Sequence, residues 1–216
     1  MPGYIQVNSK VVQVPVGPGR EVLARRGAML AYTGQVSFRP LTAAQGMAGM
    51  LGRAVAGETV KQMVAEGSGQ VFYGYRGLHV TVIELTRGEA LQVEADRLLC
   101  HDASLTSSVV FLGQQGGIRG AVRGAVSGQG LFTTQLVGDG SVVVLAHGGA
   151  IGMPVSPGRV VAVDPQAYVG HRGQLSVDVS ASLGWREAVG RGSGEAIQLR
   201  VRGQGVVYVQ ASEQKF

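Results

Sequence analysis

Apolar and polar residues alternate along most of the chain in short, valine-rich runs that end at glycines. Val12, Val14 and Val16 fall on one face of a strand predicted within residues 3–16. Residues 20–38 have the pattern of two strands joined by a turn at Gly27, and residues 78–85 that of another strand. Alternation of this kind, repeated many times, predicts an all-β fold.

Three Gly-x-Gly triplets separate strand-like runs: Gly67-Ser68-Gly69, Gly138-Asp139-Gly140 and Gly203-Gln204-Gly205. Glycine is the residue that tight hairpin turns most often need, because it tolerates positive φ. Each triplet is therefore predicted to be the turn of a β-hairpin.

Similar features recur at intervals of about 70 residues. Gly19 and Gly88 are 69 residues apart, and Gly88 and Gly158 are 70 apart. We expect one domain, residues 1–216, made of three repeated β-sandwich units at about 17–85, 86–155 and 156–216, with 1–16 as an added N-terminal strand. Because a small sandwich leaves its edge strands exposed, the units are expected to cover one another around a pseudo-three-fold axis.

The hydrophobic period changes between residues 41 and 56. Met47, Met50 and Leu51, followed by Ala54 and Val55, have the spacing of one helix face. Interspersed glycines weaken such a helix, so a short helical or ordered loop insertion is expected. If exposed, Met47, Met50 and Leu51 are candidates for an apolar contact surface; the alternative is that they pack in the core.

The composition is that of a folded protein, with 45% hydrophobic and 15% charged residues. The 35 glycines do not recur every third residue, which excludes collagen. Cys100 is the single cysteine, so no internal disulfide forms and a reducing compartment is favoured. The first residues lack the pattern of a signal peptide and no apolar run reaches the length of a membrane span, so a cytoplasmic protein is expected.

The formal net charge of +5 permits an anionic partner. Five arginines lie in glycine-rich segments of the three units and are candidates for an anion- or partner-binding patch: Arg53, Arg119, Arg123, Arg186 and Arg191. The alternative is that they only keep these segments soluble. Nucleic acid is the less favoured partner, because an aromatic content of 6% offers few side chains on which bases can stack.

No nucleophile elbow, phosphate loop, zinc-protease motif or cysteine pair occurs, so we expect no enzyme activity, no catalytic residues and no cofactor. His101 and His171 are 70 residues apart and share one repeat position, which Tyr32 occupies in the first unit. Convergence of the three would suggest zinc, but tyrosine is a poor third ligand, so no metal site is expected. Cys100 is expected to be a buried small residue.

Four segments together resemble a known family: GREVLARRGAMLAYTGQV, GMLGRAVAGETV, GIRGAVRGAVSGQGLFTTQLVGDGSVVVLAHGGAI and SGEAIQLRVRGQGVVYVQ. The chain is similar to bacterial relatives of a yeast mitochondrial-biogenesis protein named for altered inheritance of mitochondria. The resemblance implies a fold like that of the tryptophan-RNA-binding attenuator protein (TRAP), with three units in one chain and no established enzymatic activity. It also implies a link to inner mitochondrial membrane organisation in yeast, although no transit peptide is recognised here.

These observations favour a non-catalytic interaction or scaffold protein, acting as an oligomer or at a membrane surface. Its partner is expected to be an unidentified protein or further copies of the chain, without a disulfide partner. The alternative is binding of RNA or another polyanion through the five arginines.

Overall fold

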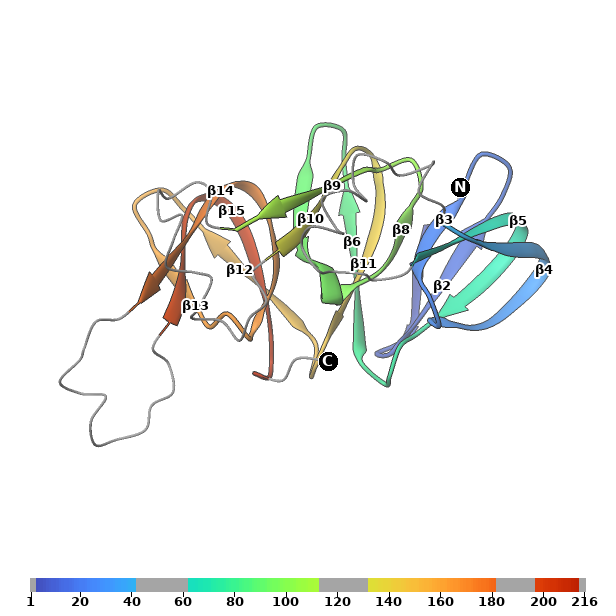
Figure 1. Cartoon of the computed structure of the whole chain (residues 1–216), viewed down its shortest axis with the longest axis horizontal. Helices are drawn as coiled ribbons and strands as arrows, with labels where there is room; N and C mark the ends of the chain where they lie inside the picture. Colours follow the sequence, from blue (N-terminus) through green and yellow to red (C-terminus); the bar gives the residue numbers. More distant parts are fainter. Residues whose placement is uncertain (1–2, 42–61, 113–131, 182–196, 214–216) are drawn as a thin grey trace.

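The computed structural model describes residues 3–41, 62–112, 132–181 and 197–213, which form strands joined by turns and one 3-10 turn, η2 (Ala95–Arg97) (Figure 1). The strands of the described residues are, in chain order, β1 (Ile5–Asn8), β2 (Val11–Val16), β3 (Val22–Arg25), β4 (Met29–Pro40), β5 (Gln62–Tyr73), β6 (His79–Leu85), β7 (Ala90–Glu94), β8 (Leu98–Asp102), β9 (Thr106–Phe111), β10 (Phe132–Val137), β11 (Gly140–Ala146), β12 (Ala150–Val155), β13 (Val161–Val163), β14 (Tyr168–Ala181) and β15 (Ile197–Gln210). The prediction of an all-β fold is confirmed.

The first sheet has eight strands, with β5 at the centre of its N-terminal part. One edge of β5 pairs along its length with β4, and the other edge pairs with β2 and β3. The sheet then continues from β3 to β8, from β8 to β11 and from β11 to β6, and every one of these pairs is antiparallel. Val12, Val14 and Val16 of β2 all point into the core, as their alternation predicts.

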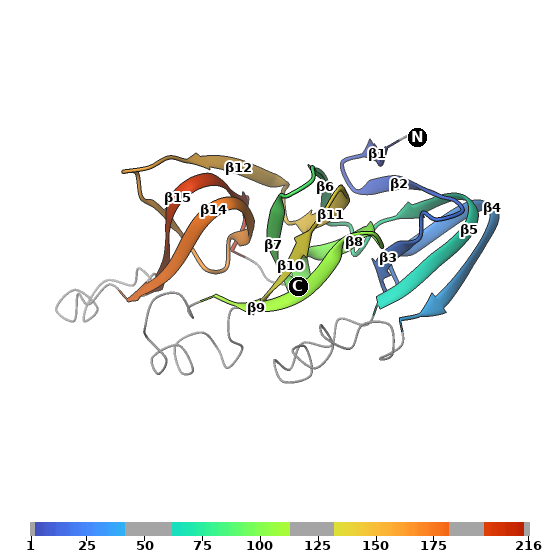
Figure 2. The ribbon, with the colours of Figure 1, turned by 90° about the horizontal axis from the view of Figure 1, so that it is seen from above.

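The second sheet has seven strands and is arranged around β15. Strand β14 pairs with one edge of β15, while β12 and β13 pair with the other edge. Strand β14 also pairs with β7, which leads through β10 to β9. Figures 1 and 2 show strands β2 to β5 at one end of the long axis, β6 to β11 in the middle, and β12 to β15 at the other end.

The prediction of hairpin turns at the three Gly-x-Gly triplets is wrong. Strand β5 runs without interruption through Gly67 and Gly69, and β15 runs through Gly203 and Gly205. The second triplet, Gly138-Asp139-Gly140, falls where β10 ends and β11 begins, and these two strands do not pair with each other. These glycines serve close strand contact, because a Cβ at Gly69 would lie only 2.0 Å from the carbonyl oxygen of Thr33.

Three hydrophobic clusters form the core of the described residues, and the first two join strands from different parts of the chain. The first joins valines of β2 and β3 to Leu99, Val143 and Leu145 of β8 and β11. The second joins residues of β6, β7 and β11 to Val169 of β14 and Tyr208 of β15. Because burial of these apolar side chains is the main driving force of folding, the second cluster, which contains strands of both sheets, holds the sheets together, and the first and third clusters each stabilise one sheet.

Candidate functional site

The residues that the sequence singled out for contact with a partner fall outside the part of the chain that the structure describes. This applies to the basic candidates Arg53, Arg119, Arg123, Arg186 and Arg191 and to the apolar candidates Met47, Met50 and Leu51. They lie in three segments that connect β4 to β5, β9 to β10 and β14 to β15. Their roles remain predictions.

His101 and His171 lie in different sheets, on β8 and β14. The Nδ1 atom of His101 is 2.9 Å from the backbone oxygen of Asp102. The Tyr168 hydroxyl and Nδ1 of His171 are hydrogen-bonded at 2.6 Å, and burial lowers the pKa of His171 to about 4, so this imidazole is neutral at pH 7. Within the described ranges, no group of three or more His, Cys, Asp or Glu side chains has the arrangement of a metal site.

Cys100 is fully buried in the cluster between β2, β3, β8 and β11. Burial and the nearby Asp102 carboxylate raise the pKa of its thiol. The thiol is therefore protonated, and a buried, protonated thiol is a poor nucleophile. The expectation of a small buried residue at this position agrees with its surroundings.

A surface hollow of about 400 Å³ lies where β3 meets β8 and is lined by Arg20, Asp102 and their neighbours. The Asp102 carboxylate accepts hydrogen bonds from the Tyr4 hydroxyl at 3.0 Å and from the backbone nitrogen of Ser141 at 2.8 Å. Arg20 Nε is 3.6 Å from the same carboxylate. Asp102 is thus used to fix the N-terminal segment and β11 to β8, which is a structural role.

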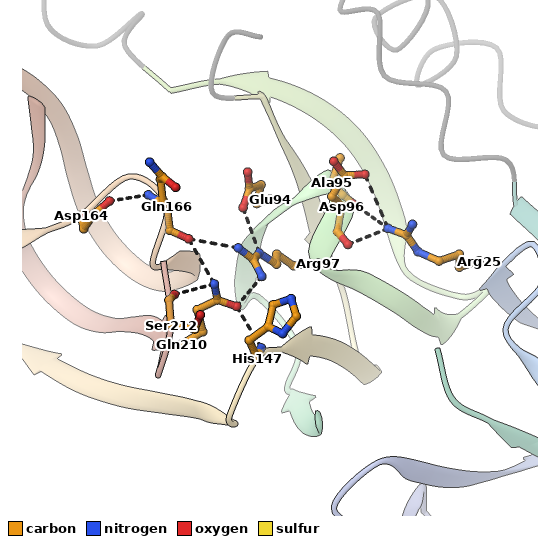
Figure 3. A network of polar contacts seen from close by, with 10 residues as sticks. All are labelled: Arg25, Glu94, Ala95, Asp96, Arg97, His147, Asp164, Gln166, Gln210 and Ser212. Atoms are coloured by element: carbon orange, nitrogen blue, oxygen red, sulfur yellow. Dashed lines mark hydrogen bonds and ion pairs between the residues drawn. The ribbon is translucent and has the colours of Figure 1, made fainter. Parts of the chain in front are cut away.

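A polar network surrounds η2, the short turn that follows β7 (Figure 3). The guanidinium of Arg97, with 1% of the residue exposed, donates to Glu94 Oε2 at 3.1 Å and to the carbonyl oxygen of Gln166 at 3.1 Å. It also donates to the side-chain oxygen of Gln210, which accepts the backbone N–H of His147 at 3.0 Å. One buried arginine therefore connects η2 to β15 and to the segment before β14.

Arg25 at the end of β3 contacts the same turn from the other direction. Its Nη2 donates to the carbonyl oxygen of Asp96 at 2.6 Å and lies 3.7 Å from the Asp96 carboxylate, and its Nε donates to Leu98 at 3.3 Å. Figure 3 shows Arg25 and Arg97 on either side of η2. The donors and acceptors in this network satisfy one another, so its chemistry is that of a joint between strands.

Large apolar side chains are exposed at both ends of the molecule. At one end, Met29, Leu30 and Tyr32 of β4 are 37%, 57% and 48% exposed. At the other end, Ile151 and Met153 of β12 are 58% and 38% exposed. Val160, which precedes β13, is 46% exposed, and two further apolar residues are exposed on β1. Grouped apolar side chains on strands are a feature of surfaces that contact other proteins.

The polar network and the exposed strands were not predicted from the sequence. Arg97 sits in the run Glu94-Ala95-Asp96-Arg97 directly after a strand, and this mixture of charges does not show which groups become buried. Residues 29–32 of β4 form a continuous apolar run, which is also typical of a buried strand, so the pattern identifies a strand but not its place at an edge. The exposure of Met29 and Leu30 was detectable only once the pairing was known.

Comparison with known proteins agrees with this architecture. The crystal structure of a protein from Streptococcus pyogenes superposes with a TM-score of 0.70 and 20% sequence identity, covering 97% of this chain and 92% of that one. This similarity shows that the two share a fold. None of the curated proteins compared with the chain is similar enough to count as a relative.

The fold is thus that of an all-β protein with two joined antiparallel sheets. The family described as mitochondrial biogenesis AIM24 matches residues 4–212, and the chain belongs to this family. The resemblance found in the sequence is confirmed. Within the described residues, no helix has the length and apolar character that crossing a membrane requires.

Proposed function

We propose that this member of the AIM24 family is a non-catalytic interaction or scaffold protein that binds other proteins through its exposed apolar strands. The observation that carries the proposal is the exposure of Met29, Leu30 and Tyr32 at one end and of Ile151 and Met153 at the other. Apolar surface in water costs about 25 cal/mol per Å², and a partner that covers it recovers this free energy. The buried polar groups described above are used within the fold, which favours a structural role over catalysis.

We also propose that the chain consists of three units with one plan, at about residues 17–85, 86–155 and 156–216. The pairing pattern supports this. In the first unit β5 has β4 on one edge and β2 and β3 on the other, and β15 in the third has β14, β12 and β13 in the same places. In the middle, β10 and β11 together take the place of the long strand, with β7, β9, β6 and β8 as neighbours. The pseudo-three-fold axis stays a prediction.

The family description supports an organising role rather than a reaction, because it names mitochondrial biogenesis and no chemical step. For this chain we propose contact with a protein partner, with peripheral attachment to a membrane surface as a second setting for the same apolar strands. A buried, reduced Cys100 suits a cytoplasmic location.

The test is a quantitative affinity purification from cells that express the protein at its natural level. The variant Leu30→Lys with Ile151→Lys places a charge at each end of the molecule. The amount of protein that co-purifies with it should be at least about tenfold lower than with the wild type. Gln6→Lys, an exposed substitution on β1, is the matched control and should keep them. Equal recovery with all three baits would contradict the proposal.

The alternative function is binding of RNA or another polyanion through Arg53, Arg119, Arg123, Arg186 and Arg191. Its support is the net charge of +5 and the grouping of these arginines in the segments between strands. A gel shift with mixed RNA at low salt that disappears in Arg119→Ala with Arg123→Ala would favour it, because phosphate contacts weaken steeply with salt. Absence of a shift at low salt would remove it.

A further inference from the structure

Two strand pairs of the same kind join the three parts of the chain. Strand β3 pairs with β8, with Leu23 opposite His101. Strand β7 pairs with β14, with Gln92 opposite His171. The two pairs have the same register. The residue before Leu23 in β3, Val22, lies opposite Asp102, and the residue before Gln92 in β7, Leu91, lies opposite Arg172. The chain therefore uses one antiparallel joint twice.

Strand β13 corresponds to β3 and β7 by its own pairing. In each strand, one residue pairs with the position three residues before the first glycine of a Gly-x-Gly triplet. The three pairs are Leu23 with Val64, Gln92 with Gln135 and Ala162 with Arg200. Where β3 and β7 have a second partner, β13 has none among the described residues, since its only pairing is with β15.

Strand β4 corresponds in the same way to β8 and β14, and unlike them it has an open second edge among the described residues. Its pairing is with β5, and no other described strand pairs with it. Figures 1 and 2 both place β4 and the β13–β15 region at opposite ends of the long axis, so the two open edges do not meet within the chain.

Strands β4, β8 and β14 each contain one bulged residue, and its exposure differs between the open strand β4 and the other two. The pairing slips by one residue at Leu30 in β4, at Leu99 in β8 and at Val169 in β14. Leu99 is 0% exposed and Val169 is 1% exposed, because each inserts into the core of the preceding part of the chain. Leu30, at the corresponding bulge, is 57% exposed.

The complementary surface lies at the other end. Val14 of β2 and Ile83 of β6 are buried in the clusters that receive Leu99 and Val169. Met153 of β12 has the corresponding pairing, opposite Val207 as Val14 is opposite Val71, yet it is 38% exposed. Ile151, two positions before it on the same face of β12, is 58% exposed. This end has the apolar residues that would surround a Leu30 side chain.

We propose that a second copy of this chain fills the joint: β13 of one copy pairs with β4 of the next in antiparallel orientation, with Ala162 opposite Tyr32. The bulged Leu30 then enters the surface formed by Ile151 and Met153. The inference rests on the proposed role as an interaction protein and names its partner as the chain itself. Because the two surfaces differ, the contact is head-to-tail, and it closes into a ring or continues as an open row according to the rotation at each joint.

The first test is the mass of the purified full chain by analytical ultracentrifugation over a range of concentrations. Wild type should associate, whereas Leu30→Lys and Met153→Lys, which block opposite ends, should each associate at least about tenfold more weakly. A mixture of the two variants should give a dimer with one chain of each, because each keeps the end that the other has lost. Val7→Lys, an equally exposed apolar position on β1, should associate like wild type.

The second test reads the register by disulfide formation between two chains. Chains with Tyr32→Cys mixed with chains with Ala162→Cys should form a covalent dimer under mild oxidation, because opposite residues of antiparallel strands are within disulfide reach. Ser37→Cys, exposed further along β4, should not cross-link to Ala162→Cys. Native Cys100 is buried and does not compete.

A wild type that stays a single chain at all concentrations would overturn the inference. It would also be overturned if the Tyr32→Cys, Ala162→Cys double variant closed its disulfide only within one chain. Neither result would touch the proposed function, which depends on partners recovered from cells and would still be tested by the affinity purification. Equal recovery of those partners with all three baits, with self-association intact, would instead contradict the proposed function alone.

Discussion

At the level of single side chains, His171 makes folding sensitive to pH. Burial lowers its pKa from 6.5 to about 4 in the folded chain, so between these values the unfolded chain binds a proton that the folded chain does not. The free energy of unfolding should therefore fall as the pH is lowered from about 6.5 to about 4, by about 3 kcal/mol in total from this residue. Urea unfolding at a series of pH values measures the loss.

His171→Gln is the matched variant for this measurement. The glutamine side-chain oxygen can accept the hydrogen bond from the Tyr168 hydroxyl, but glutamine does not titrate. The variant should keep its stability better than wild type between pH 6.5 and 4, and the two curves should run parallel above pH 7. Identical pH dependence in both proteins would show that His171 does not contribute.

At the level of elements, glycines set how closely the long strands approach. A Cβ at Gly205 of β15 would lie 2.1 Å from the carbonyl oxygen of Arg172 and 3.1 Å from the Gly173 Cα of β14. Gly205→Ala should therefore force the strands apart and lower the free energy of unfolding by about 1–3 kcal/mol, measured by urea titration. Gly17→Ala, with open space around its Cβ, is the control and should change stability by less than about 0.5 kcal/mol.

The same glycines explain where prediction of the elements from sequence succeeded and failed. Alternation in β2 correctly predicts a strand with Val12 and Val14 buried, because side-chain direction follows directly from period two. The sequence predicts a turn at Gly67 and Gly69, since a turn and a close strand contact both require a missing side chain. Only the pairing partner distinguishes the two cases, and in β5 that partner is a distant segment centred on Gly34.

The candidate surfaces were less predictable than the fold for a related reason. Leu30, Leu99 and Val169 are all apolar residues at corresponding positions, and nothing local separates the exposed one from the two buried ones. Exposure of Leu30 follows from the pairing of β4, because β8 and β14 have a described strand on each edge and β4 has one on a single edge. That property belongs to the arrangement of the chain and is not encoded in the pattern around residue 30.

For the molecule as a whole, the clusters that cross from one part of the chain to the next predict cooperative unfolding. Val169 and Tyr208 lie in a core with Leu91, so the third part cannot unfold without exposing the second. Calorimetry of the wild type should show a single transition whose calorimetric and van't Hoff enthalpies agree. Two separated transitions would mean that the parts are independent.

Arg97 tests how far the joint between these parts depends on polar contacts. Arg97→Ala removes the guanidinium that lies 3.1 Å from the Glu94 carboxylate, and so takes away an ion pair from a carboxylate that is only 8% exposed. The cost should be about 3 kcal/mol, which for a chain of this length lowers the melting temperature by roughly 6–12 °C. Arg202→Ala breaks a solvent-exposed pair with Asp178 and should cost at most about 1 kcal/mol. Since the apolar cluster remains in Arg97→Ala, its transition should stay single; a second transition would show that the arginine network, rather than the shared core, couples the two parts.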